Sequence, residues 1–221
     1  MHDYQNPALS PEQRTADLLS RMTLEEKVGQ MIQVSYNQVT PEEAEDWEVN
    51  KHVGSFLHVL GSNARRLQAL SRETRLGIPL LFGIDAIHGH ALHRGATVFP
   101  SQLAMSCSWN PVLLEAVGRA TAREVAADGL HWTFSPVLCI GRDLRWGRIG
   151  ETFGEDPYLI GILAAAIIRG YQGRRLADPD SILACAKHYL AYGESTGGRD
   201  SYDAAVSFRK IRETFLSPFK M

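Results

Sequence analysis

The chain has 221 residues, 44% hydrophobic and 22% charged, which is an ordinary globular composition, but it is shorter than the ~250 residues of a complete eight-stranded α/β barrel. The formal net charge is −2 with acids and bases mixed throughout, so no basic stripe indicates a nucleic-acid partner. No apolar run approaches the ~20 residues of a membrane helix, so we expect no membrane span.

The first half of the chain alternates helical segments with short apolar runs. Ser10-Pro11 predicts a helix that ends at Arg21, and the capping-box spacing of Thr23 with Glu26 opens a second helix. The apolar runs predict three strands, with a third helix before the last of them. These strands are expected over residues 31–34, 53–59 and 78–84, and the third helix over residues 63–74.

The second half continues the same alternation. Proline directly after a capping side chain suits the first helical turn, and this pairing predicts two long helices. They run from Asn110-Pro111 to Ala127 and from Asp156-Pro157 to Gln172. Two further strands are expected over residues 132–138 and 182–186, and a last helix from Ser207 to the final residue.

Strands that alternate with helices predict an α/β fold with a parallel sheet. The polar clusters come directly after strands, at residues 85–93, 142–156 and 187–200. A barrel builds its active site at those strand ends, whereas the glycine pattern of a dinucleotide-binding sheet is absent. With about five strands, we expect a partial (β/α) TIM-type barrel that this chain alone does not close.

Two features bear on the cellular compartment. The first residues, 1–5, lack the layout of a signal peptide, which leaves either a cytoplasmic protein or a secreted or periplasmic one whose signal was removed. The three cysteines, at positions 107, 139 and 185, are odd in number and far apart, so we expect buried thiols rather than disulfides or a zinc site.

Each polar cluster has a structural interpretation as well as a functional one. Asp85 can accept hydrogen bonds from two sugar hydroxyls, or it can serve as a cap or ion-pair partner. The three arginines and four acids of residues 142–156 can bind paired oxygens, or order their own loop through salt bridges. Lys187 and His188 can both face a ligand only where a strand ends, because adjacent strand residues point to opposite faces.

Taken together and in order, these motifs resemble glycoside hydrolase family 3, in its β-glucosidase branch. The resemblance covers nearly the whole chain and makes residues 1–221 the N-terminal part of a barrel domain, with the rest of the barrel and a second α/β domain absent. Its motifs are Met22–Met31, Gly83–Gly89, Thr97–Pro100, Arg145–Arg148, Phe153–Pro157, Lys187–Tyr189 and Phe215–Lys220.

The resemblance implies hydrolysis of terminal non-reducing β-D-glucosyl residues with retention of configuration. It implies that a β-linked glucoside or gluco-oligosaccharide binds to Asp85, Arg148, Lys187 and His188, and that no cofactor or metal is needed. The chemistry agrees, because a carboxylate accepts from hydroxyls while arginine and lysine donate charge-assisted hydrogen bonds.

The resemblance places the catalytic carboxyl groups outside this sequence. Retaining hydrolysis needs a nucleophile and an acid/base ~5 Å apart. In the family the nucleophile lies in a Ser-Asp-Trp-like motif, which does not occur after Lys187, and the acid/base often comes from the next domain. We therefore assign no catalytic residue, not even Glu151, Glu155 or Asp200, and expect the isolated chain to be inactive.

The sugar preference follows from two positions. The N-acetylglucosaminidase branch usually carries a second histidine after its Lys-His pair, and here that stretch, Lys187–Gly193, has none. The xylosidase branch tends to carry glutamate where this chain has Asp85, which favours a hexose, with glucose first.

Two alternatives remain. A metal-dependent hydrolase barrel would use His88 and His90, with Lys187-His188 supplying further ligands to an ion that activates water. The other alternative is a sugar-binding remnant without catalysis, or one half of an assembly completed by a second polypeptide. Because an unclosed barrel exposes strand edges, we expect self-association of the chain alone.

Overall fold

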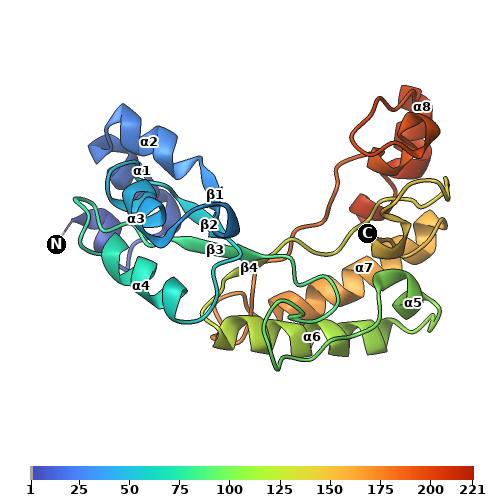
Figure 1. Cartoon of the computed structure of the whole chain (residues 1–221), viewed down its shortest axis with the longest axis horizontal. Coiled ribbons are helices and arrows are strands. Elements are labelled where there is room, and N and C mark those ends of the chain that lie inside the picture. The colour runs from blue at the N-terminus through green and yellow to red at the C-terminus, as the bar shows by residue number, and fades with distance from the viewer. Residues whose placement is uncertain (1) are drawn as a thin grey trace. The chain divides into compact units, whose positions relative to one another are not determined.

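The computed structural model describes residues 2–221, which form two compact units, one ending at Phe82 and the other running from Gly83 to Met221 (Figure 1). The first unit contains α1 (Pro11–Arg21), α2 (Leu24–Gln30), β1 (Gln33–Ser35), α3 (Pro41–Val49), β2 (Ser55–Leu57), α4 (Ser62–Ser71) and the start of β3 (Leu81–Ile84). The second unit contains the end of β3, then α5 (Gln102–Ser106), α6 (Pro111–Ala127), β4 (Trp132–Thr133), α7 (Pro157–Gln172) and α8 (Phe208–Lys210).

Helix starts in the first unit are fixed by side-chain caps. The Ser10 and Thr23 hydroxyls accept hydrogen bonds from the backbone N–H three residues later. In turn, the side chains of Gln13 and Glu26 accept hydrogen bonds from the backbone N–H of Ser10 and Thr23. These capping boxes satisfy N–H groups that have no partner within the helix. The starts of α1 and α2 are therefore confirmed, whereas α3, which begins with the same motif at Thr40, is an additional helix.

The strands are parallel and shorter than predicted. Within the first unit, Val34 of β1 lies opposite Phe56 of β2, and the Leu81 N–H donates to the Gly54 carbonyl at 3.1 Å. Within the second unit, Ile84 of β3 lies opposite Thr133 of β4. The strand order is β1-β2-β3-β4, so the predicted α/β class with a parallel sheet is confirmed, while the assignment to a partial, unclosed barrel stays a prediction.

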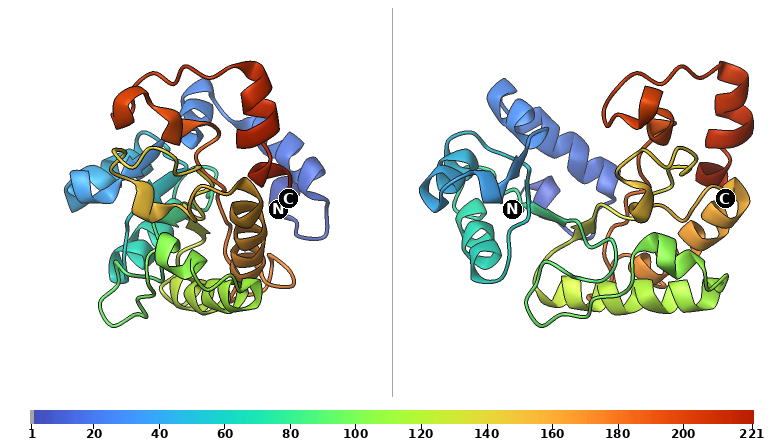
Figure 2. Two further views of the ribbon diagram at one scale, coloured as in Figure 1. Left: turned by 90° about the vertical axis from the view of Figure 1, so that its right-hand side faces the viewer. Right: turned by 45° about the vertical axis from the view of Figure 1, so that its right-hand side comes forward.

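Helices α6 and α7 lie side by side in every view (Figures 1 and 2) and have the bounds that their Asn-Pro and Asp-Pro starts predict. Two glycines allow the close approach. A Cβ on Gly118 would collide with the Ile167 carbonyl oxygen, and one on Gly170 with the Glu115 carbonyl oxygen. The contact therefore requires residues without side chains.

Two predicted strands of the second unit, over residues 132–138 and 182–186, differ from the structure. The strand expected over residues 132–138 ends at Thr133, because Pro136 has no N–H to donate to a ladder. The fifth strand, expected over residues 182–186, does not form as a continuous strand. Among the described residues, this stretch and Lys187 pair with residues 131–138 through the isolated parallel bridges Trp132–Leu183 and Val137–Lys187 and through separate backbone hydrogen bonds.

The last predicted helix is also wrong in its extent. It breaks into α8, a π-helical turn at Ile211–Phe215 and a 3₁₀ turn at Pro218–Lys220. Proline lacks an N–H and its ring clashes with the carbonyl four residues earlier, so Pro218 interrupts a regular helix.

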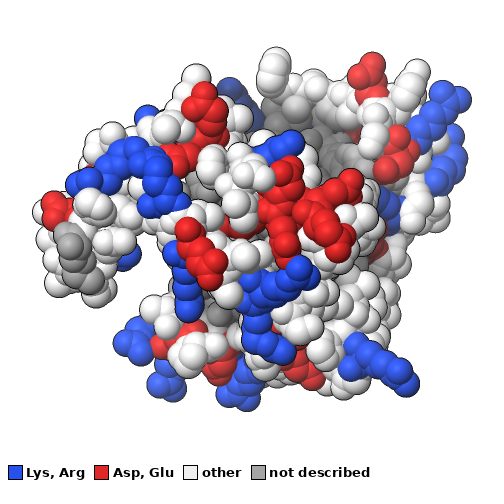
Figure 3. Space-filling model, turned by 60° about the vertical axis from the view of Figure 1, so that its left-hand side comes forward, with Lys and Arg blue, Asp and Glu red and all other residues white. Residues whose placement is uncertain are grey.

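The surface charge agrees with the sequence, and the thiols agree in part. On the face shown in Figure 3, basic and acidic side chains are interspersed, as the small net charge predicts. All three thiols are free; Cys139 is buried and Cys185 half-buried, but Cys107 is exposed, which corrects the expectation of three buried thiols. In the described part of the chain, no helix has the length and apolar content to span a membrane.

Candidate functional site

Asp85 and Lys187, two of the four predicted sugar ligands, form a direct ion pair. Lys187 Nζ lies 2.9 Å from Asp85 Oδ1. Asp85 directly follows β3, and the backbone of Lys187 is held by the Pro136 carbonyl and the Leu138 N–H. The lysine ammonium also lies 5.9 Å from the centre of the Phe134 ring, a cation–π distance. The chain thus brings together a carboxylate that directly follows β3 and an ammonium from a segment 102 positions later.

His188, the third predicted ligand, is joined to a buried thiol. Its backbone N–H donates to Cys139 Sγ at 3.5 Å, and its Nδ1 lies 3.4 Å from the same sulfur. Burial raises the pKa of Cys139, so the sulfur remains a thiol near neutrality. A thiol that accepts from the backbone can donate its hydrogen to Nδ1, which places the imidazole proton on Nε2.

Burial also keeps the His188 ring neutral. Desolvation, followed by the nearby positive charges of Arg148 and Lys187, lowers the pKa of His188 from 6.5 to about 4. The second cause places His188 within electrostatic reach of both Arg148 and Lys187. At neutral pH the site therefore combines two cations with one neutral imidazole.

Arg148, the fourth predicted ligand, is fixed by two neighbours. Its Nε and Nη2 donate to the two carboxylate oxygens of Glu151 at 2.8 and 2.7 Å. Its Nη1 donates to the Tyr192 hydroxyl at 3.3 Å, and the guanidinium carbon lies 5.4 Å from the centre of that ring. The Glu151 carboxylate raises the pKa of Arg148 above its usual value, so the cation is permanent. This fork-to-fork pairing sets the plane of the guanidinium.

Tyr192 connects the two halves of the site. Its ring lies 4.8 Å from the His188 ring and 5.3 Å from the Trp146 ring, measured between centroids. Its hydroxyl donates to Asp200 Oδ1 at 2.5 Å, and the Trp146 Nε1–H donates to the same oxygen at 3.1 Å. Trp146 is buried and packs with Val137 and Cys139. The apolar cluster of Val137, Cys139 and Trp146, with Tyr192 packed against it, therefore supports the side chains of Arg148 and His188.

Three supporting residues were missed in the sequence: Cys139, Trp146 and Tyr192. Their roles depend on contacts across 8 to 54 positions, which no local pattern announces. The apolar run before Cys139 and the position of Tyr192 four residues after His188 are the weak signals that were present.

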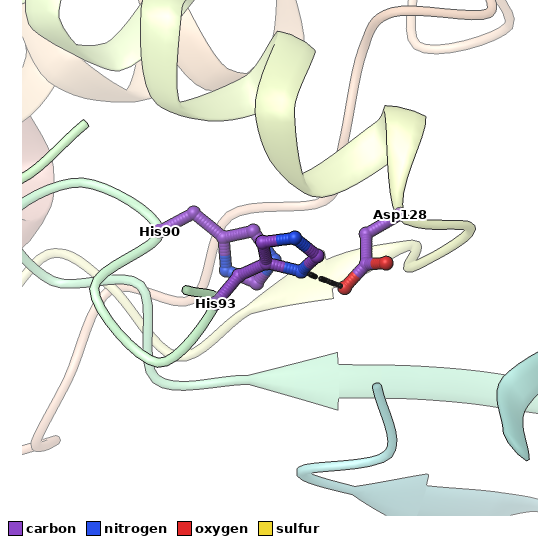
Figure 4. A group of neighbouring side chains, drawn as sticks. All are labelled: His90, His93 and Asp128. Atoms are coloured by element: carbon purple, nitrogen blue, oxygen red, sulfur yellow. Dashed lines mark hydrogen bonds and ion pairs between the residues drawn. The ribbon is translucent and has the colours of Figure 1, made fainter. Parts of the chain in front are cut away.

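The histidines of the alternative metal site are separated by the fold. His88 Nδ1 lies 3.0 Å from the Phe99 carbonyl oxygen. His90 instead lies beside His93 and Asp128, as Figure 4 shows, and these three form the group of potential metal ligands found among residues 2–221. The His88–His90 pairing of the metal-hydrolase alternative is therefore not the grouping that the structure presents.

The family follows from comparison with known proteins. Residues 23–221 match the N-terminal domain of glycosyl hydrolase family 3. The chain belongs to this family, as its motifs predict.

Two curated relatives show the range of the match. The periplasmic beta-glucosidase of Salmonella typhimurium is 36% identical over 221 residues, which cover 97% of this chain and 28% of the relative. The beta-xylosidase of Formosa agariphila is 32% identical over 197 residues, which cover 85% of this chain and 27% of the relative. The chain thus spans less than a third of the length of either relative.

Solved structures show the same fold. A β-glucosidase involved in saponin metabolism from intestinal bacteria is 55% identical with a TM-score of 0.84, covering 94% of this chain and 27% of that one. The β-glucosidase from Listeria innocua in complex with glucose is 34% identical with a TM-score of 0.85, covering 95% of this chain and 31% of that one.

Proposed function

We propose that this chain forms the glucose-binding subsite of a retaining β-glucosidase. The observation that carries the proposal is the ion pair of Asp85 with Lys187, with His188 next to it in the chain. A hexose presents adjacent hydroxyls that both donate and accept hydrogen bonds. A site for it therefore needs acceptors and donors side by side, and Asp85 with Lys187 supplies one of each.

The donors and acceptors suit a sugar in number as well as in kind. A carboxylate offers about four lone-pair positions, so Asp85 can bind Lys187 and accept from sugar hydroxyls together. Arg148 has five N–H donors, of which three serve Glu151 and Tyr192, leaving two for the ligand. Because its orientation is fixed by Glu151, little conformational freedom is lost when it binds a hydroxyl.

The tautomer of His188 gives it a defined role. We propose that the Cys139 thiol donates to His188 Nδ1, which lies 3.4 Å from Sγ, so that the Nε2–H is the donor that remains for a ligand. The neutral ring also avoids a third positive charge beside Lys187 and Arg148. We therefore assign His188 Nε2 as the donor to a third hydroxyl of the sugar.

The acids around the site are engaged in other contacts, which supports a binding role without the catalytic pair. Asp143, Glu151 and Glu194 each form an ion pair, and Asp200 accepts from Trp146 and Tyr192. A nucleophile and an acid/base need two carboxyl groups that face the sugar ~5 Å apart. We propose that both catalytic carboxyl groups lie outside these residues.

We propose that the subsite prefers glucose over xylose. Relatives of this chain are named for both activities, and the Listeria innocua relative is described in complex with glucose. Xylose lacks the hydroxymethyl group that glucose carries. Ligand-observed NMR with each sugar tests the choice: stronger binding of glucose is expected, whereas equal or stronger binding of xylose would exclude it.

The test of the proposal is hydrolysis of an aryl β-glucoside by the purified 221-residue chain, with circular dichroism showing that it is folded. We expect no turnover above the uncatalysed rate. Turnover by the folded chain would place the catalytic carboxyl groups inside these residues and overturn this part of the proposal.

A further inference from the structure

A second cluster of polar side chains lies in the same unit as the sugar site but takes no part in it. His90 Nε2 lies 3.3 Å from Asp128 Oδ2, and His93 Nδ1 lies 2.9 Å from the same oxygen. The two imidazole centroids are 5.3 Å apart, and both rings lie beside the Asp128 carboxylate (Figure 4). Two imidazoles and one carboxylate thus converge on one point.

The loop that carries the histidines is closed at its base. The Phe99 N–H donates to the His88 carbonyl at 2.8 Å, and Gly89 pairs with Val98 in an antiparallel bridge. Gly89 has φ +92°, and a Cβ there would collide with the Thr97 carbonyl oxygen, so the turn requires glycine. Between these paired ends, the His93 N–H donates to the His90 carbonyl and the Ala96 N–H donates to the His93 carbonyl, which forms two successive turns in the loop.

Asp128 is equally well placed. It caps the C-terminus of the 17-residue helix α6, where the helix dipole favours a cation. One turn earlier on the helix, Glu124 accepts from the Thr97 N–H and hydroxyl and adds a second negative charge. Both acids line a cavity of about 330 Å³ together with His90, His93 and the cation Arg94.

We propose that His90, His93 and Asp128 bind one divalent transition-metal ion, with Zn²⁺ as the probe. Imidazole nitrogens with a carboxylate oxygen are a donor set for such ions, and positions left open take water. The cavity beside the three ligands supplies room for that water. The proposal is independent of the proposed glucosidase function.

The donor atoms are close to a coordinating arrangement. An ion ~2.0–2.1 Å from each ligand requires donor atoms ~3–4 Å apart. Two of the three pairs, both to Asp128, already meet this, and all three atoms lie within 4.8 Å of one another. His93 is 41% exposed on its side chain, so its ring can rotate to close the third pair, whereas buried His90 is fixed.

The buried ring of His90 can present Nε2 to an ion. Its Nδ1 has no hydrogen-bond partner among residues 2–221, so no second bond holds the ring proton on Nε2. When an ion binds Nε2, the proton resides on Nδ1 and the imidazole stays neutral. Binding of the ion then replaces the hydrogen bonds of His90 and His93 to Asp128, and it links the loop that carries the two histidines to the C-terminal end of α6.

The test is isothermal titration of the metal-free 221-residue chain with Zn²⁺, and with Co²⁺, whose visible d–d absorption reports ligand geometry. We expect one ion per chain and a Co²⁺ spectrum that indicates nitrogen and oxygen ligands. His93→Gln and Asp128→Asn should each weaken Zn²⁺ binding by more than about 100-fold, since even outer-shell changes cost up to that factor.

His2→Gln is the matched control, because His2 is an exposed histidine in the other unit, and its substitution should leave Zn²⁺ binding unchanged. Circular dichroism of each variant separates loss of ligand from loss of fold. Absence of stoichiometric Zn²⁺ binding by the wild-type chain would overturn the proposal. Binding that persists in folded His93→Gln and Asp128→Asn would also overturn it.

Discussion

Lys187 Nζ lies 2.9 Å from Asp85 Oδ1, and this contact joins two segments that are 102 positions apart in the chain. The lysine side chain is only 13% exposed, while the aspartate is 37% exposed. The ammonium is therefore the more desolvated partner, and its interaction with the carboxylate offsets the free-energy cost of burying its charge. Substitution of the acid leaves a largely buried charge without this partner.

Loss of the Asp85 carboxylate should lower stability. Asp85→Ala is expected to reduce the free energy of unfolding by about 1–3 kcal/mol, because Lys187 loses its charge partner in a partly desolvated position. Urea unfolding followed by circular dichroism measures the change. Glu213→Ala, which breaks the exposed pair with Arg209, is the control and should shift stability by less than about 0.5 kcal/mol. Equal effects of the two substitutions would contradict the assignment.

His188 should make stability depend on pH. Its folded pKa of about 4 lies below the usual 6.5, so the unfolded chain binds more protons between these values. The contribution of His188 is therefore complete above pH 6.5 and is lost as the pH falls towards 4. Urea midpoints of wild type and His188→Gln should converge at low pH. A difference that stays constant from about pH 4.5 to about pH 7.5 would refute the shift.

Glu48 should act in the opposite direction. It is 3% exposed, its Oε2 has no hydrogen-bond partner among residues 2–221, and burial raises its pKa from 4.5 to about 7. The folded chain then binds more protons than the unfolded chain between these values, so stability falls as the pH rises through 7. Glu48→Gln mimics the protonated acid and should raise the melting temperature at about pH 8. An unchanged or lower value would contradict burial of the carboxyl group.

The contact between α6 and α7 should not tolerate a methyl group. Gly170→Ala is expected to destabilise the chain by about 1–3 kcal/mol, the usual cost of overpacking, because its Cβ would meet the Glu115 carbonyl and the Arg119 backbone. Gly150→Ala is the control, since a Cβ there meets no atom within 4 Å. Thermal unfolding compares the two variants, and a stabilised Gly170→Ala would show that the helices pack less closely.

Much of the helical fold could be predicted because helix starts are local. Ser10-Pro11, Asn110-Pro111 and Asp156-Pro157 each bring a cap and a proline together, and all three helices begin where these pairs predict. Strand lengths depend on partners far along the chain, so the apolar stretch at residues 182–186 predicts a strand where only isolated bridges form.

The four proposed ligands come from sequence motifs, whereas the residues that contact and support them do not. Family motifs single out Asp85, Lys187 and the other two proposed ligands, and the structure joins Asp85 to Lys187 directly. The contacts of Tyr192 with Arg148 and His188 depend on how the loops fold over Trp146. Such tertiary contacts follow from packing, which no single motif encodes.

Binding of glucose by these residues is tested most directly by isothermal titration of glucose into the folded chain and into its Asp85→Asn variant. We expect one bound glucose per wild-type chain. In the variant, loss of charge-assisted hydrogen bonds worth about 1.5–3 kcal/mol should weaken binding by roughly ten- to a hundredfold. Equal affinity in both proteins, or no binding by the wild-type chain, would contradict the assignment of a glucose-binding subsite.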